Sequence, residues 1–191
     1  GQFGHVVLVG GGLGVAPVFP QLRAFKEAGN RTTGIIGFRN KDLVFWEEKF
    51  GAQCDNLIVC TDDGSYGKPG FVTAALQEVL ERDKPDLVVA CYGINDGIYQ
   101  PLDASRQLAF QDGIIKLRLA CIRAGAQVVI VTPPLYAPDN RAKDAINYDG
   151  VMEAYGIRHA LLVGPNSGYG TDNRCLLDAI TRAPGRLKGI A

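Results

Sequence analysis

Val6-Val-Leu-Val-Gly-Gly-Gly-Leu-Gly-Val-Ala-Pro17 is the stretch that decides the fold of this chain. Four apolar residues run directly into four glycines within five positions, and a proline follows where a helix would begin. A continuous apolar run is typical of a strand covered on both faces, and the glycines allow a tight turn. The stretch therefore predicts a strand, a turn and a helix N-terminus, which are the parts of a phosphate-binding βα turn.

The overall composition indicates a globular protein with no affinity for nucleic acid or membranes. The chain has 191 residues, 47% of them hydrophobic, and its 20 basic and 20 acidic residues give zero net charge. No apolar run approaches the roughly 20 residues of a membrane span, and no signal peptide is visible. The five cysteines never form a C-x-x-C pair, so reduced, mostly buried thiols are expected. We expect a cytoplasmic-type soluble protein, as obtained by recombinant expression, that is a monomer or weak homodimer without a specific partner.

The remainder of the chain alternates short apolar runs with helical patterns. The predicted strands are His5–Val9, Thr33–Phe38, Asn56–Thr61, Asp86–Cys91, Gln127–Thr132, His159–Val163 and Arg186–Ile190. The predicted helical faces carry Val18, Leu22 and Phe25; Leu43, Trp46 and Phe50; Val72, Leu76, Val79 and Leu80; and Leu108, Ile115, Leu119 and Ile122. This alternation predicts one doubly wound, Rossmann-like α/β domain over residues 1–191. It would be a three-layer sandwich with a parallel sheet of about seven strands in the order 3-2-1-4-5-6-7.

In such sheets, ligands bind at the carboxyl ends of the strands, near the point where the strand order reverses. The predicted nucleotide-binding residues are Gly10, Gly11, Gly12, Leu13, Gly14, Ala16, Pro17 and Arg39. The predicted pocket residues on neighbouring loops are Asp62, Asp63, Ser65, Gly93 and Asn95. The Asp62–Asp63 pair can bind a metal or ribose hydroxyls, or can serve turn formation, and both interpretations stay open.

Three motifs in order carry a family resemblance over about residues 3–91. They are Gly10-Gly-Gly-Leu-Gly-Val-Ala-Pro17, Gly34-Ile-Ile-Gly-Phe-Arg39 and Thr61-Asp-Asp-Gly-Ser-Tyr-Gly-Lys-Pro-Gly-Phe-Val-Thr73. This region resembles the pyridine-nucleotide-binding domain of the ferredoxin–NADP reductase superfamily, especially the flavin-containing electron-transfer subunits related to the dihydroorotate dehydrogenase B partner and to sulfide dehydrogenase. The resemblance implies that the glycine turn holds a pyrophosphate. Arg39 then favours a 2′-phosphate, and so NADP, or is a solvated loop residue.

Two features of that family are missing. We expect that no flavin-binding barrel precedes residue 1, and the family's Cys-Gly-Pro is replaced by Cys91-Tyr-Gly-Ile-Asn. From Tyr92 to about Tyr155 the chain instead resembles an SGNH (GDSL-type) ester hydrolase, with Asn95 and the Gly93 backbone as the implied oxyanion donors. That family's nucleophilic serine and Asp-x-x-His are absent here. Residues 156–191 resemble a fragment of the amidohydrolase-2 family, a TIM barrel, without its metal ligands.

The three resemblances lead to a main hypothesis and two alternatives. The main hypothesis is an engineered chimera of fragments 1–91, 92–155 and 156–191. It would be a de novo scaffold with no catalytic residues, no metal and no required cofactor, although the glycine turn could keep a phosphate or sulfate ion or weakly bound NADP. The first alternative is an NAD(P)-binding electron-transfer module. The second is an SGNH-type ester hydrolase that works through Asn95.

Overall fold

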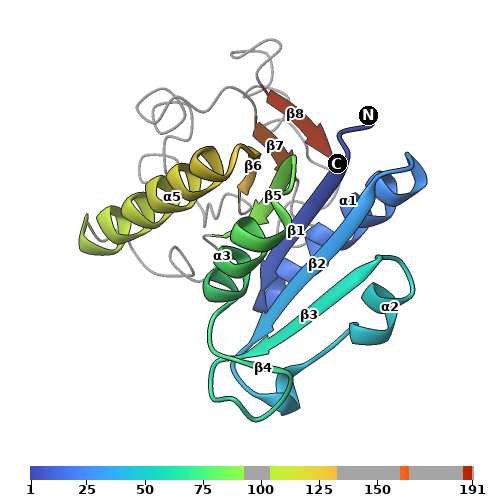
Figure 1. Cartoon of the computed structure of the whole chain (residues 1–191). Helices are drawn as coiled ribbons and strands as arrows, with labels where there is room; N and C mark the ends of the chain where they lie inside the picture. The colour runs from blue at the N-terminus through green and yellow to red at the C-terminus, as the bar shows by residue number, and fades with distance from the viewer. Residues whose placement is uncertain (93–103, 133–159, 164–186, 191) are drawn as a thin grey trace. The chain divides into compact units, whose positions relative to one another are not determined.

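The structure, a computed structural model, describes residues 1–92, 104–132, 160–163 and 187–190. Its contacts divide the chain into two compact units. Figure 1 labels the helices and strands by their place in the chain. The first unit comprises residues 1–92 and 116–129, and the second comprises residues 93–115 and 130–191. The prediction that residues 1–191 form one domain therefore stays a prediction.

The first unit is built on a parallel sheet. Its strands are β1 (His5–Gly11), β2 (Arg31–Phe38), β3 (Asn56–Thr61), β4 (Lys68–Pro69) and β5 (Leu87–Cys91), followed by the start of β6 (Gln127–Thr132). The strand order is β4-β3-β2-β1-β5-β6. β1 pairs with both β2 and β5, since Val6 lies opposite Thr32 on one side and Leu87 on the other. The order reverses between β1 and β5, which places the switch point beside the glycine turn.

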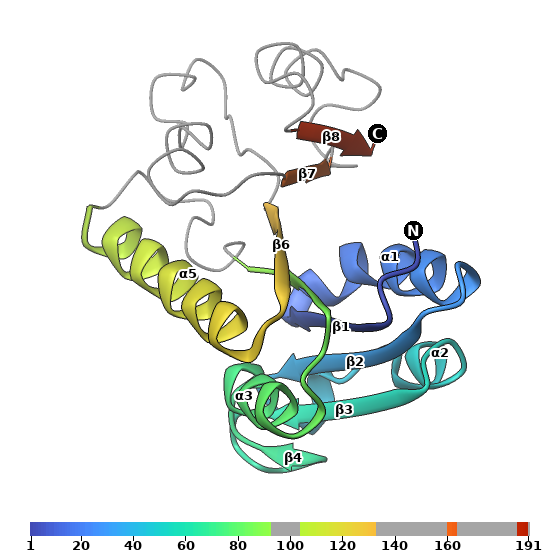
Figure 2. The ribbon, with the colours of Figure 1, turned by 45° about the horizontal axis from the view of Figure 1, so that its top comes forward.

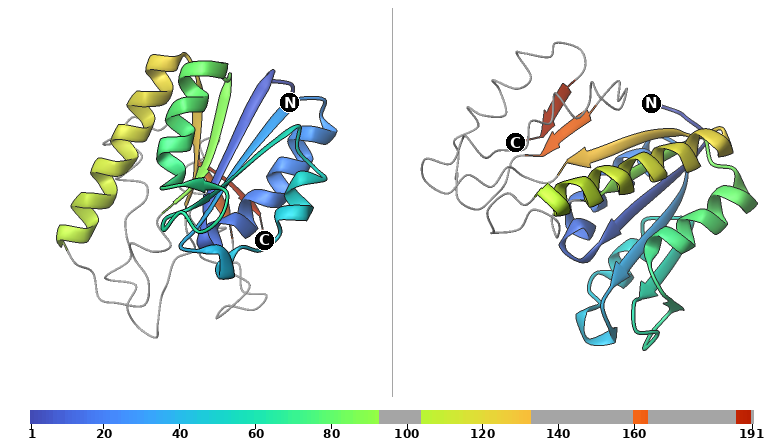
Figure 3. Two further views of the ribbon diagram at one scale, coloured as in Figure 1. Left: turned by 60° about the horizontal axis from the view of Figure 1, so that its bottom comes forward. Right: turned by 90° about the vertical axis from the view of Figure 1, so that its left-hand side faces the viewer.

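Helices cover both faces of this sheet. α1 (Val15–Glu27) and α2 (Glu47–Gly51) lie on one face, and α3 (Val72–Asp83) lies on the other (Figure 3, left). Because the sheet is covered twice, the middle strands are continuously buried, as the apolar run in β1 predicts. All four predicted core residues of α3 are buried, and so are Val18 and Leu22 of α1. Gly37 at the end of β2 allows α3 to pack closely, because a Cβ there would collide with Val72.

The predicted face of Leu43, Trp46 and Phe50 does not form on one helix. Leu43 ends a short 3₁₀ turn, η2 (Lys41–Leu43), and only Phe50 is buried. Trp46 lies between the turn and α2 with a left-handed backbone, at φ 60°. The prediction fails because aromatic packing outweighs helical periodicity in this segment: Trp46 contacts Phe19 and Phe45 at ring-centre distances of 5.7 and 5.6 Å.

The buried residues of the helix α5 (Ala104–Ala124) do not lie on the predicted face. Leu108, Leu119 and Ile122 are 65%, 40% and 52% exposed, whereas Ile114 and Cys121 are 5% and 0% exposed. The helix carries apolar residues on two faces, so periodicity alone could not select the buried one. Among the residues described, no helix is long and apolar enough to cross a membrane.

In the second unit, the described strands continue the same pattern. The end of β6 pairs in parallel with β7 (Ala160–Val163), which pairs in parallel with β8 (Leu187–Ile190). The order is thus β6-β7-β8. Apart from the two-residue β4, the predicted order 3-2-1-4-5-6-7 and the α/β, Rossmann-like fold class are confirmed. Figure 2 shows the strands β1, β2 and β3 together with the helices α1, α2 and α3.

Candidate functional site: the glycine turn and the neighbouring strand ends

The glycine turn joins β1 to α1 at the switch point. β1 ends at Gly11, a single 3₁₀ turn, η1 (Gly12–Gly14), follows, and α1 begins at Val15. Gly12 adopts a left-handed backbone at φ 53°, which favours glycine. Ala16 and Pro17 are the second and third residues of α1. The structure therefore places the predicted phosphate-binding residues at positions 10–17 in one continuous turn.

Close packing requires glycine at both ends of this turn. A Cβ at Gly10 would lie 2.8 Å from the Gly14 carbonyl oxygen, and a Cβ at Gly14 would lie 3.0 Å from the Cys91 carbonyl oxygen on β5. Both contacts are with backbone atoms, which cannot rotate away. Gly10 and Gly14 therefore allow the turn to pack closely against the ends of β1 and β5.

Gly11 has a different environment. A Cβ built there meets no atom within 4 Å, so the space beside its backbone is open. Gly11 is half-buried, and Leu13, two residues later, is exposed. At the start of α1, the N-cap residue is Gly14, which has no side chain to cap the helix, and the first turn carries no acidic residue. The open side of the turn thus combines accessible backbone with a helix N-terminus that favours negative charge.

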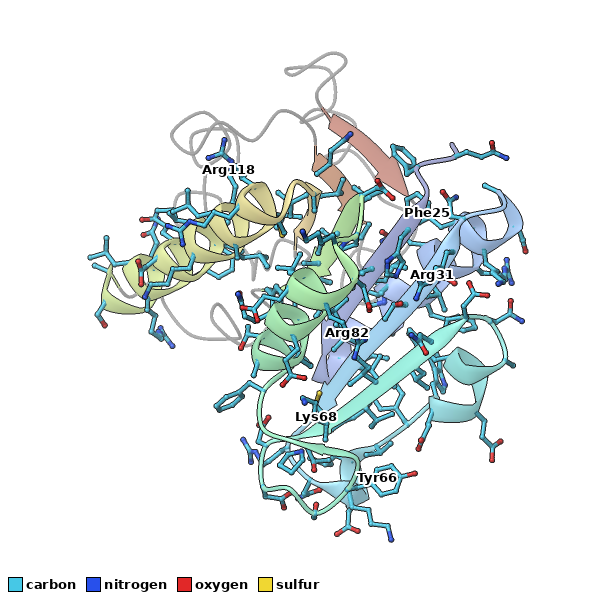
Figure 4. All side chains as sticks on the ribbon, in the orientation of Figure 1. Phe25, Arg31, Tyr66, Lys68, Arg82 and Arg118 are labelled. Carbon is cyan, nitrogen blue, oxygen red and sulfur yellow. The ribbon has the colours of Figure 1, made fainter. Side chains whose placement is uncertain are left out.

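Two more loops reach this edge of the sheet. Arg39 directly follows β2 and is exposed, and Asp62 and Asp63 directly follow β3. The loops run side by side, because the Asp62 N–H donates to the Phe38 carbonyl (3.0 Å) and the Asp63 N–H donates to the Arg39 carbonyl (3.3 Å). Tyr66 and Lys68 mark this end of the sheet in Figure 4, whereas Phe25 and Arg31 mark the other end.

Asp63 and Ser65 are bonded to each other. The N–H and hydroxyl of Ser65 donate to Asp63 Oδ1 at 2.9 and 2.6 Å, and these bonds lower the pKa of Asp63. The Ser65 hydroxyl also accepts the Lys41 N–H at 2.8 Å, which ties the loop after β3 to the loop after β2. Of the two interpretations of the Asp62–Asp63 pair, these contacts support turn formation for Asp63.

Two residues that the sequence did not single out shape these loops. Thr61 is fully buried, and its hydroxyl donates to the Tyr66 carbonyl (2.6 Å) and accepts the Tyr66 N–H (3.0 Å). Lys41 carries a second positive charge two residues after Arg39. The sequence signal for Thr61 was a hydroxyl residue at the end of an apolar strand, and the signal for Lys41 was its spacing of two residues from Arg39.

Among the described residues near this edge, the buried thiol of Cys91 is unreactive. Burial raises the pKa of Cys91 to about 11, so its thiol stays protonated. His5 begins β1, at the opposite end from the glycine turn, and its Nε2 lies 2.8 Å from the Thr33 hydroxyl. Within the described residues there is no group of His, Cys, Asp or Glu arranged to hold a metal ion. Gly93, Asn95 and His159 lie outside the described residues.

Natural proteins of known type match part of the chain. The electron transfer subunit homolog of dihydroorotate dehydrogenase B from Thermotoga maritima is 41% identical over 97 residues, covering 51% of this chain and 33% of the relative. The electron transfer subunit from Shouchella clausii is 45% identical over 80 residues, 41% of this chain and 30% of the relative. The subunit from Fusobacterium nucleatum is 37% identical over 117 residues, 60% of this chain and 44% of the relative.

A solved structure agrees with these relatives. It is the structure of an NADH-dependent reduced ferredoxin–NADP oxidoreductase, solved to study flavin-based electron bifurcation. It has a TM-score of 0.51 and 29% identity, covering 71% of this chain and 42% of that one. No family model matches the chain. The chain spans about a third of the length of the first curated relatives it matches.

The hypothesis of an engineered, inert chimera is wrong. The relatives are natural electron-transfer subunits, and the Fusobacterium match extends over 117 residues, more than the fragment 1–91 could contain. The match therefore crosses the proposed join at Cys91 and Tyr92. The hydrolase resemblances receive no support from the comparisons. What the comparisons do support is the resemblance of part of the chain to the ferredoxin–NADP reductase superfamily, through natural electron transfer subunits.

Proposed function

We propose that the first unit is a pyridine-dinucleotide-binding module of an electron-transfer protein. The observation that carries this proposal is the open backbone at Gly11 beside the uncapped start of α1, at the switch point between β1 and β5. The names of the natural relatives support the electron-transfer role.

In this proposal the backbone N–H groups of Gly11–Gly14 and the start of α1 hold the pyrophosphate. The helix dipole stabilises its negative charge. When bound, the dinucleotide supplies hydride chemistry through its nicotinamide ring. The chain itself contributes binding and orientation. We propose that it is not a catalyst alone and that it works with a flavin-bearing domain or subunit.

The test is a calorimetric titration of the full chain with NADH, NADPH and ADP, with inorganic phosphate as a competitor. The informative variant is Gly11→Ala. Gly11 has an extended backbone, at φ −123° and ψ 137°, that alanine adopts freely, and its Cβ would meet no protein atom. We expect an unchanged melting temperature and dinucleotide binding weakened by about tenfold or more, because the methyl group occupies the ligand's approach.

Gly51→Ala is the matched control. Gly51 is exposed at the end of α2, and a Cβ there makes only an ordinary 3.9 Å contact with Leu57. This variant should bind as the wild type does. The proposal fails if the wild type gives no heat at millimolar ligand, or if Gly11→Ala binds as tightly as the wild type. Heat with phosphate alone would indicate a simple anion site instead.

A further inference from the structure

One face of α5 carries an apolar stripe that the fold leaves exposed. The stripe consists of Leu108, Ile115, Leu119 and Ile122. Three of these residues are spaced by seven positions, close to two helical turns, so the stripe runs along a single side of the helix. All of them are exposed except Ile115, which is half-buried, whereas Ile114 and Cys121 are the buried residues of the helix. A contiguous apolar surface of this kind is typical of a site that binds another protein.

The stripe is symmetric about Ile115, which is the property that pairing with a second copy of the same helix requires. Leu108 and Ile122 are each seven residues from Ile115. When two copies of α5 pair antiparallel with Ile115 opposite Ile115, Leu108 of each copy therefore lies opposite Ile122 of the other. Apolar side chains then meet along about 21 Å of helix. Such a pair is closed, because each copy uses the same surface.

The charged residues that border the stripe select the antiparallel orientation. Asp112 and Lys116 are exposed and lie along one edge of the stripe, one helical turn apart, and Arg118, labelled in Figure 4, lies along the other edge. In an antiparallel pair each edge faces the same edge of the second helix, so Asp112 of each copy lies beside Lys116 of the other. A parallel pair would join opposite edges and bring Lys116 beside Arg118, where like charges repel.

We propose that α5 is a homodimerisation surface through which two copies of this chain pair antiparallel about Ile115. The occupant of the stripe is a second copy, because the apolar residues and the charges of Asp112 and Lys116 match under the same two-fold rotation. A single helix face buries less than the roughly 800 Å² per partner of a standard interface, so we expect a dissociation constant on the order of 100 μM. This association goes beyond the proposed dinucleotide binding and does not require it.

Sedimentation equilibrium of the full chain, from about 10 μM to about 1 mM, measures the association. Leu108→Gln should raise the dissociation constant about tenfold or more, because it removes apolar surface from the pair. Phe71→Gln is the matched control, since Phe71 lies outside α5 and is 66% exposed, as against 65% for Leu108. Asp112→Lys should also weaken the dimer, and adding Lys116→Asp should restore it, because the double exchange pairs opposite charges again. Thermal melts at about 5 μM, where the chain is monomeric, verify that each variant is folded.

Disulfide crosslinking tests the orientation. Under mild oxidation, Ile115→Cys should give a covalent dimer above the background of the wild type, because the two substituted positions face each other. Leu108→Cys should not, since its two positions lie about 21 Å apart, beyond the reach of a disulfide. Crosslinking of both variants would mean a parallel pair and would overturn the proposal. So would equal effects of Leu108→Gln and Phe71→Gln on association. A chain that stays monomeric at about 1 mM would leave the stripe to a partner subunit or to another segment of this chain, and would overturn it as well.

Discussion

At the amino ends of the strands in the first unit, a buried polar side chain is fully engaged by backbone groups, whereas at the carboxyl ends several polar groups remain open to solvent. Asn30, which is 4% exposed, accepts the N–H groups of Phe3 and Gly4 and donates to the carbonyls of Gly1 and Phe25. At the other end, Arg39, Asp62 and the Gly11 backbone are accessible. The comparison teaches that the unused bonding capacity of polar residues, rather than their presence, distinguishes the edge for which we propose dinucleotide binding.

The largest expected effect is a loss of folding stability when the glycine turn at the carboxyl edge is altered. Gly10→Ala should lower the free energy of unfolding by about 3 kcal/mol, because the new Cβ meets the backbone of Gly14 and Val15. Chemical denaturation measures this change, and Gly11→Ala, with open space at its Cβ, should show almost none. Equal stabilities of the two variants would contradict the described packing of the turn.

The next effect belongs to the amino edge alone. Asn30→Ala should cost about 2 kcal/mol, because Asn30 is buried and its four part-buried hydrogen bonds to backbone groups are lost. Dinucleotide affinity should not change, which calorimetry can verify. Asn30→Asp is the comparison variant, since it keeps the acceptor for Phe3 and Gly4 but loses the donors. A loss of affinity in Asn30→Ala, with the fold intact, would erase the distinction between the two edges.

His5 should give the amino edge a pH dependence. Burial, with a smaller effect from Arg31, lowers the pKa of His5 below its ordinary value of 6.5. The unfolded chain therefore binds a proton first as the pH falls, and stability declines as the pH drops through 6.5. Thermal melts between pH 8 and pH 5 should show this slope in the wild type. His5→Gln should flatten it, and an identical slope in that variant would assign the dependence to another group.

The smallest effect concerns the ion pair of Lys26 and Asp55. The hydrogen bond from Lys26, assisted by the Thr32 N–H at 2.8 Å, holds the pKa of Asp55 below 3.8. A lowered carboxyl pKa stabilises the fold above that value, and the contribution is lost as the pH falls through the lowered pKa. Because the Asp55 side chain is 39% exposed, Asp55→Asn should cost less than about 1 kcal/mol at neutral pH. Acid titrations that followed the same curve for both proteins would exclude this role.

Much of the fold was predictable from local pattern. The apolar runs located β3 and β6 at their observed bounds and the others to within two residues. β4 was missed, because two residues that include a proline carry no strand signal. The buried face of α5 was wrong, because Ile114 and Cys121 compete with a second apolar stripe and only tertiary packing selects between them.

The candidate site was predictable only in part, for a different reason. Glycine spacing located the turn, but the sequence could not show that Gly10 and Gly14 are packed while Gly11 is open, because that depends on where β5 lies. Nor could it show that Ser65 engages Asp63 and holds Lys41. The chimera hypothesis was wrong because departures from a family motif after Cys91 were interpreted as a join. The length of the natural match contradicts that interpretation.

The short strand β4 has a consequence for how this unit behaves at high concentration. β4 is the last strand on its side of the sheet, where an unpaired strand could recruit a strand from another molecule. Its two residues are Lys68, which pairs with Glu78, and Pro69, which has no N–H to donate. A charge, a missing donor and a length of two residues together make a poor template for edge-to-edge pairing. The sequence of β4 thus disfavours aggregation through the outer edge of the sheet.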